Sequence, residues 1–171
     1  MTKINAEDLE KSIRYAITAH SKYPNVPENS TRKWDKKTPY SVHPIWCAMM
    51  LLTETTLPEK LREAGYQALL YHDVLEDTTA KLPEGLSSYV TNLVKDLTYR
   101  NSGAAMHEIW EKSKEVRLLK LYDGVSNLLD GIWMDKSKKI KKFEHVRKLA
   151  DDVEKNFGEL NIVKIAKGLT K

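Results

Sequence analysis

Residues 68–78 have the sequence ALLYHDVLEDT, and this stretch decides how the rest of the chain is interpreted. His72 and Glu76, like Asp73 and Asp77, are four residues apart, so on a helix each pair shares neighbouring surface. The apolar residues around them draw part of this face toward a core, where unpaired carboxylates are costly. A positive partner is therefore expected, and a bound divalent cation would supply one.

A simpler interpretation stays open for the end of this segment. Glu76 and Asp77 lie near the predicted C-terminal end of a helix, where the helix dipole already disfavours negative charge. They could point into water there without any ligand. The neighbouring His72 and Asp73, placed on an apolar helix, favour the cation.

A second polar cluster lies in residues 115–133, EVRLLKLYDGVSNLLDGIW. Lys120, Asp123 and Asn127 are spaced by three and four residues, so they form one polar stripe on an otherwise largely apolar helix. Gly124 should cost this helix about 1 kcal/mol relative to alanine. It therefore indicates a close approach beside Asp123, either of another helix or of a ligand.

Hydrophobic periodicity predicts helices along the whole chain and no strand that alternates with period two. We expect an all-α bundle of seven or eight helices, in which Pro44 begins the second helix and His43 stands at its entrance. The polar segment at about residues 21–39 has no helical period and is long enough to be a lid-like loop. The expected helices are Ala6 to His20, a helix from Pro44, residues 58–78, Glu84 to Thr98, Ala104 to Lys112, Glu115 to Trp133, Lys138 to Asn156 and a C-terminal one.

Length and composition fit one domain spanning residues 1–171. Hydrophobic residues make up 41% of the chain and charged residues 30%, which suffices for a core and is unlike a disordered chain. The net charge of +4 is too small for a dedicated nucleic-acid-binding domain, so no nucleic acid polymer is expected as a partner. A small anionic ligand fits this charge.

Cys47 is the only cysteine, which excludes an intrachain disulfide framework and a multi-cysteine zinc ribbon. The longest apolar run, residues 45–52, is too short to span a membrane, and the first residues contain no signal-peptide core. These features predict a cytoplasmic protein with no membrane partner. The oligomeric state is not predicted.

The order of three motifs resembles the HD-domain metal-dependent phosphohydrolases: His43 in TPYSVHP, His72-Asp73 in YHDVLEDT and Asp123 in LKLYDGVSNL. A basic pair before TPY and the asparagine after the last motif make the chain similar to the RelA/SpoT-type alarmone hydrolase domain, in its small stand-alone form. The resemblance extends from about His20 to Leu128. It implies a compact HD-domain bundle.

The resemblance also implies a set of functional residues. One divalent ion, manganese in that family, would be held by His43, His72, Asp73 and Asp123, with Glu76 and Asp77 as the catalytic acidic pair. Arg32, Lys33, Asn127, Lys120 and Arg100 would contact the substrate. His20 would support the ligands from behind, or would be an ordinary core histidine.

The implied activity is hydrolysis of a phosphorylated nucleotide, most specifically removal of the 3′-pyrophosphate from guanosine alarmones such as ppGpp. One alternative is an HD phosphatase that acts on another nucleotide such as NADPH. A second alternative is a nucleotide-binding module without turnover, against which the Glu76-Asp77 pair argues, because binding alone needs no water-activating carboxylates.

The basic run of residues 136–148 contains seven lysines and arginines but also an apolar helical face. We interpret its charges as the solvated outer face of a helix. His145 lacks a ligand-like neighbour in the sequence and is assigned no chemistry.

Overall fold

The computed structural model describes residues 5–171, apart from the side chain of Ser102. Within these residues there are eight α-helices of seven residues or more, one additional α-helical turn, three short 3-10 helices and no extended strand, so the all-α prediction is confirmed. The helices are α1 (Ala6–Lys22), α2 (Val42–Leu52), α3 (Glu59–Tyr71), the single turn α4 (Val74–Asp77), α5 (Ser88–Leu97), α6 (Ser102–Glu108), α7 (Lys114–Leu129), α8 (Lys136–Phe157) and α9 (Asn161–Leu169).

The boundaries of α1 and α2 follow from their first turns. The side chain of Asn5 accepts a hydrogen bond from the backbone N–H of Glu7 and so caps α1. Helix α2 begins at Val42, two residues before the predicted start at Pro44. His43 therefore lies inside the first turn of α2 rather than at its entrance.

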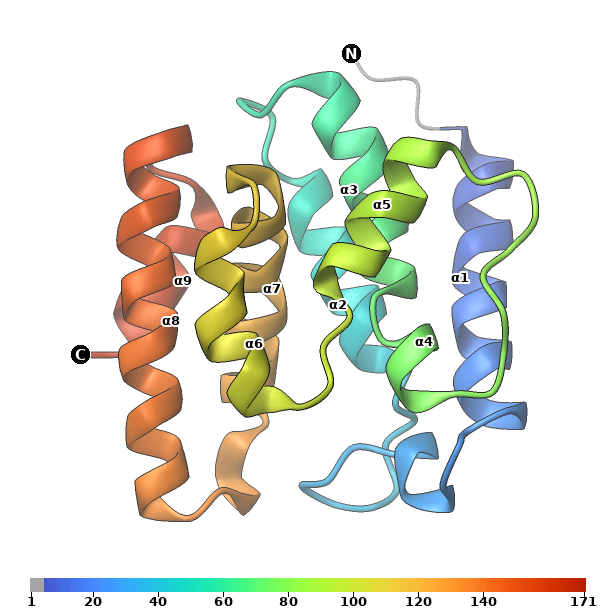
Figure 1. Ribbon diagram of the computed structural model, residues 1–171, viewed down its shortest axis with the longest axis horizontal. Helices are drawn as coiled ribbons and strands as arrows, with labels where there is room; N and C mark the ends of the chain where they lie inside the picture. The colour runs from blue at the N-terminus through green and yellow to red at the C-terminus, as the bar shows by residue number, and fades with distance from the viewer. Residues whose placement is uncertain (1–4) are drawn as a thin grey trace.

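Helix α7 is the centre of the bundle. It contacts α2, α3, α5, α8 and α9, and ten of its residues are buried. In Figure 1, α8 and α9 lie on one side of α7 and α1 lies at the opposite edge of the molecule. Among the described residues, no helix is both long enough and apolar enough to cross a membrane. The prediction that the first residues contain no signal-peptide core falls partly on residues 1–4, which lie outside the described residues.

The long helix predicted over residues 58–78 is wrong in one respect, because it is interrupted at His72 and Asp73. Helix α3 ends at Tyr71, and the chain restarts as α4, where the N–H of Asp77 donates to the backbone oxygen of Asp73 at 2.8 Å. On an unbroken helix, adjacent side chains would point about 100° apart. At this interruption His72 and Asp73 nevertheless point at the same place, with Asp73 Oδ2 3.1 Å from His72 Nε2.

The segment between α1 and α2 is fastened at several points. Near its start, the N–H of Asn25 donates to the backbone oxygen of Asp77 at 3.0 Å, and the Asn25 side chain donates to the backbone oxygen of Glu76 at 2.7 Å. The side chain of Asn29 donates to Asp77 Oδ1 at 2.9 Å. The predicted lid-like loop thus runs beside the α4 turn, and Figure 1 shows it at one end of the bundle.

Gly124 is explained by helix packing rather than by a ligand. A Cβ atom at this position would lie 2.9 Å from Cγ2 of Val146, a fully buried residue of α8. The missing side chain therefore lets α8 approach α7 closely beside Asp123. Of the two explanations given by the sequence, the structure selects the helix crossing.

We predict that Gly124→Ala destabilises the protein by about 1–3 kcal/mol, although alanine is the better helix former, because the added methyl overpacks the α7–α8 contact. Urea unfolding measures this change. The double variant Gly124→Ala/Val146→Ala, which removes the clashing methyls, should lose less stability than the two single changes added together. Additive losses would show that the contact with Val146 is not the cause.

Candidate metal centre

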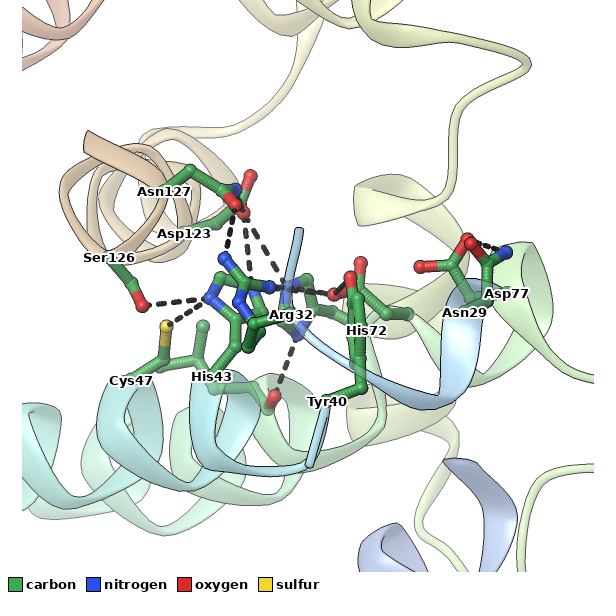
Figure 2. Close-up of polar contacts among 12 residues, drawn as sticks. Asn29, Arg32, Tyr40, His43, Cys47, His72, Asp77, Asp123, Ser126 and Asn127 are labelled. Atoms are coloured by element: carbon green, nitrogen blue, oxygen red, sulfur yellow. Dashed lines mark hydrogen bonds and ion pairs between the residues drawn. The ribbon is translucent and has the colours of Figure 1, made fainter. Parts of the chain in front are cut away.

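Three separate segments bring His43, His72, Asp73 and Asp123 together. His43 comes from the first turn of α2, His72 and Asp73 from the interruption between α3 and α4, and Asp123 from the middle of α7. All four are buried. Figure 2 shows the side chains of His43, His72 and Asp123 converging on one point.

The distances among the four side chains are short. The Nε2 atoms of His43 and His72 are 3.2 Å apart. Oδ1 of Asp123 lies 3.3 Å from Nε2 of His43 and 3.8 Å from Nε2 of His72. Oδ2 of Asp73 lies 3.4 and 3.1 Å from the same two nitrogens. Donor atoms about 2.1 Å from one ion and at right angles to each other would be about 3.0 Å apart, close to this spacing.

His72 is held in the orientation that a metal ligand requires. Its Nδ1 lies 2.7 Å from the backbone oxygen of Leu69, which can only accept a hydrogen bond. Nδ1 therefore carries a proton, and the lone pair of the neutral ring is on Nε2, which faces the cluster. Hydrogen bonds of this kind to backbone carbonyls orient metal-binding histidines in many sites.

Asp123 and Asp73 are each held by a donor outside the cluster. Lys120 Nζ lies 2.8 Å from Asp123 Oδ2, and the Tyr40 hydroxyl donates to Asp73 Oδ2 at 2.7 Å. Burial alone would raise the pKa of Asp123, but Lys120 and the two histidines hold it well below its usual value. Both carboxylates are therefore ionised and available as ligands.

These residues fit one divalent cation. The donors of His43, His72 and Asp123 all lie within 4.8 Å of one another, and Asp73 adds a second carboxylate. Burial alone would lower the pKa of His72, but Asp73 and Asp123 raise it above the usual value. The cluster thus attracts positive charge at its centre. Two imidazoles with two carboxylates suit manganese, iron or zinc better than calcium.

Glu76 and Asp77 lie beside the cluster and border the same cavity of about 210 Å³ as Asp73 and Asp123. Burial and the nearby charge of Asp73 raise the pKa of Glu76 to about 7 and that of Asp77 to about 6. The backbone N–H of Tyr99 donates to Glu76. Both carboxyls are only partly buried, and the structure places them where they can exchange a proton with a group in the cavity.

The predicted substrate contacts divide into three groups. Lys33, Lys120 and Asn127 border the cavity. Arg32 is buried, with Nε hydrogen-bonded to Asp130 and an Nη2–Asn127 Oδ1 distance of 2.9 Å, so it fastens the loop to the end of α7. Arg100 is exposed and does not border this cavity.

His20 lies behind the centre. Its ring stacks on that of Tyr40, with centroids 4.6 Å apart, and Tyr40 in turn donates to Asp73. Burial lowers the pKa of His20 to about 4, so the ring is neutral at pH 7. His20 thus contacts the site through Tyr40. The sequence analysis did not single out Tyr40, and its position in the TPYSVHP motif is the one sequence signal that could have indicated its contact with Asp73.

Lys142 and His145, three residues apart on α8, also border the cavity. The interpretation of the charges of residues 136–148 as a solvated outer face is therefore wrong for Lys142, and His145, which was assigned no chemistry, borders the same cavity. Burial lowers the pKa of Lys142, and it lowers that of His145 to about 4. A lysine-rich helix gives no sequence signal that distinguishes the one lysine facing inward.

A larger cavity of about 610 Å³ adjoins the first and shares Lys33, Asn127 and Lys142 with it. Trp133, Met106 and Met134 supply apolar surface in its wall. Lys33 and Lys138 both lie over the ring of Trp133, 5.1 and 4.4 Å from its centre. The two cavities together offer a basic, polar end beside the metal centre and a more apolar end farther away.

The chain matches no family model and no curated protein in sequence comparisons. Among solved structures it is similar to a protein described as a metazoan ortholog of SpoT that hydrolyses ppGpp and plays a role in starvation responses. The TM-score is 0.74, the sequence identity is 22%, and the match covers 99% of this chain and 96% of the other. The predicted bundle is thereby confirmed as a fold.

We predict that Mn²⁺ raises the free energy of unfolding, by about 2.7 kcal/mol when the free ion is at 100 times its Kd, because the ion binds only the assembled cluster. Urea unfolding with Mn²⁺ and with a chelator measures the difference. Asp123→Asn should remove this gain, whereas Asp151→Asn, an exposed position on α8, should keep it. An equal gain in both variants would place the ion elsewhere.

Proposed function

We propose that this chain is a single-domain, metal-dependent phosphohydrolase of the HD type, most specifically one that removes the 3′-pyrophosphate from guanosine alarmones such as ppGpp in the cytoplasm. The observation that carries the proposal is the convergence of two imidazoles and two carboxylates beside a cavity bordered by lysines and by two carboxyls of raised pKa. The ion is Mn²⁺, held by His43, His72, Asp73 and Asp123.

The cavity suits a phosphorylated substrate. Lys33, Lys120 and Lys142 surround it, and lysine ammonium groups are common phosphate ligands. Two contacts fix the position of Lys120: its Nζ pairs with Asp123 and lies 4.9 Å from the centre of the Tyr99 ring. Diphosphate oxygens in this cavity would thus lie between the lysines and the metal centre.

The adjoining cavity suits the nucleoside. Its volume of about 610 Å³ falls within the usual range of small-molecule sites, and Trp133 gives it an aromatic surface. Asn127 borders both cavities. Its Oδ1 accepts from Arg32 and its Nδ2 donates to Asp123, so the second hydrogen of Nδ2 would bond a ribose or phosphate oxygen where the cavities meet. A nucleotide whose phosphates face the metal centre fits this division.

The chemistry follows from the positions of the acidic pair. When bound, a divalent ion supplies Lewis acid activation of a phosphoryl oxygen and of water. Glu76 and Asp77 are placed to orient the attacking water and to accept its proton. The three lysines balance the charge that develops on the phosphate oxygens. Water adds to phosphorus, the bond to the ribose 3′ oxygen breaks, and ppGpp gives GDP and pyrophosphate.

The similar solved structure supports the choice of substrate, because that protein is described as hydrolysing ppGpp. The same cavities could take another nucleotide, and NADPH is the principal alternative. A binding module without turnover would not explain Glu76 and Asp77. Their raised pKa values show that burial and the charge of Asp73 disfavour the ionised carboxylates at these positions, and binding alone needs no such groups.

The test measures pyrophosphate and phosphate release from ppGpp, NADPH and GTP, with Mn²⁺ and after chelation. We predict Mn²⁺-dependent pyrophosphate release from ppGpp. Phosphate release from NADPH alone would select the alternative substrate. Binding of ppGpp without any turnover would contradict the proposal and favour the binding module.

Variants in the same assay separate catalysis from metal binding. Glu76→Gln should lower kcat by about 100-fold or more, the usual contribution of a general base, while Mn²⁺ affinity stays nearly unchanged. Asp73→Ala should lose both the activity and the affinity for Mn²⁺. Glu84→Gln, at an exposed position outside the site, is the matched control and should retain full activity.

A further inference from the structure

The two histidines of the metal centre are oriented by different partners. Nδ1 of His72 is fixed by the backbone oxygen of Leu69. Nδ1 of His43 instead lies 2.8 Å from the side-chain oxygen of Ser126. Figure 2 shows the Ser126 side chain joined by a dashed line to one nitrogen of the His43 ring.

Ser126 reaches His43 because of its place on α7. It lies three residues after Asp123, so both side chains project from neighbouring positions of one helix toward α2. Asp123 meets the Nε2 end of the His43 ring, and Ser126 meets the Nδ1 end. One helix thus contributes a candidate metal ligand and also holds the ring of another.

No other contact of His43 Nδ1 is comparable. The Sγ atom of Cys47 lies 4.0 Å away, and a thiol is a much weaker hydrogen-bonding group than a hydroxyl. Ser126 is buried and also borders a separate hollow of about 430 Å³, in which Trp34, Trp46 and Val42 supply apolar surface. Nδ1 therefore depends on one hydroxyl for a strong partner within the described residues.

We propose that Ser126 is a positioning residue of the metal centre, which accepts a hydrogen bond from Nδ1–H of His43 and thereby holds Nε2 toward the cation. The inference rests on the proposed function in one respect, the presence of that cation. In the metal-bound state the ring keeps its Nδ1 proton and presents the Nε2 lone pair to the ion. If Nε2 carries a proton before the ion binds, the ion displaces that proton. The Nδ1 proton and its hydrogen bond to Ser126 are the same before and after ion binding.

The test uses two variants of equal shape. Ser126→Thr keeps the hydroxyl and adds a methyl, and Ser126→Val has the same branched shape without the hydroxyl. The adjacent hollow gives the extra methyl room in both. The Kd for Mn²⁺ is measured from the electron paramagnetic resonance signal of the free ion.

The threonine variant should bind Mn²⁺ nearly as well as the wild type, and the valine variant about 10- to 100-fold more weakly, the usual effect of removing a ligand's hydrogen-bond partner. In the Zn²⁺-loaded protein, the Nδ1 proton of His43 should exchange slowly with solvent in the threonine variant and rapidly in the valine variant. Unfolding of the chelated proteins should be similar for the two, which excludes a general loss of structure.

The outcomes distinguish this inference from the proposed function. Equal Mn²⁺ affinity in the two variants, with tight binding by the wild type, would overturn the role of Ser126 and leave the metal centre standing. A wild type that does not bind Mn²⁺ would contradict the proposed function and this inference together.

Discussion

The structure depends on placing two ionised carboxylates next to two imidazoles inside an apolar bundle. Buried charges of this kind persist only when they are paired and hydrogen-bonded. Asp123 pairs with Lys120 through Oδ2 and faces the histidines with Oδ1, whereas Asp73 uses Oδ2 both to accept from Tyr40 and to face the histidines. The central position of α7 makes the arrangement rigid, because helices on several sides hold it in place. The close α7–α8 crossing at Gly124 brings Lys142 and His145 to the same cavity.

Two departures from regular structure complete the site. At the interruption between α3 and α4, the adjacent residues His72 and Asp73 bring their side chains to one point, with Asp73 Oδ2 3.1 Å from His72 Nε2. The segment between α1 and α2 is fastened to α4 through Asn25 and Asn29, and to the end of α7 through Arg32. The candidate catalytic pair, Glu76 and Asp77, therefore forms the end of the short helical turn α4 rather than part of a long helix. Its position is set by hydrogen bonds on both sides.

The sequence predicted the features that depend on periodicity and spacing. The all-α class follows from hydrophobic patterns, and the polar stripe of Lys120, Asp123 and Asn127 lies on one helix as expected. That His43, His72, Asp73 and Asp123 would meet was implied by the family resemblance, since no local pattern brings three distant segments together. Their roles as ligands remain a prediction.

The remaining features depend on tertiary contacts that leave no pattern in the sequence. The stretch ALLYHDVLEDT contains no glycine or proline, and the moderate helix propensities of Tyr71 to Val74 are too weak a signal to predict its interruption. Lys142 is one lysine among many on α8, and only the crossing with α7 turns it inward. The contacts of Arg32 with Asp130 and Asn127 could not be read from the sequence either, and its contact with the substrate stays a prediction. Ser126 has no distinguishing neighbour in sequence, because its partner His43 is 83 residues away.

The central claim is that one ion occupies the point where the four side chains converge. A crystal structure of the protein grown with Mn²⁺, with anomalous scattering recorded at the manganese absorption edge, tests it directly. The account predicts a single anomalous peak about 2.0–2.2 Å from Nε2 of His43, Nε2 of His72 and one oxygen each of Asp73 and Asp123. Manganese bound elsewhere, with the four side chains still in contact and no peak between them, would contradict it.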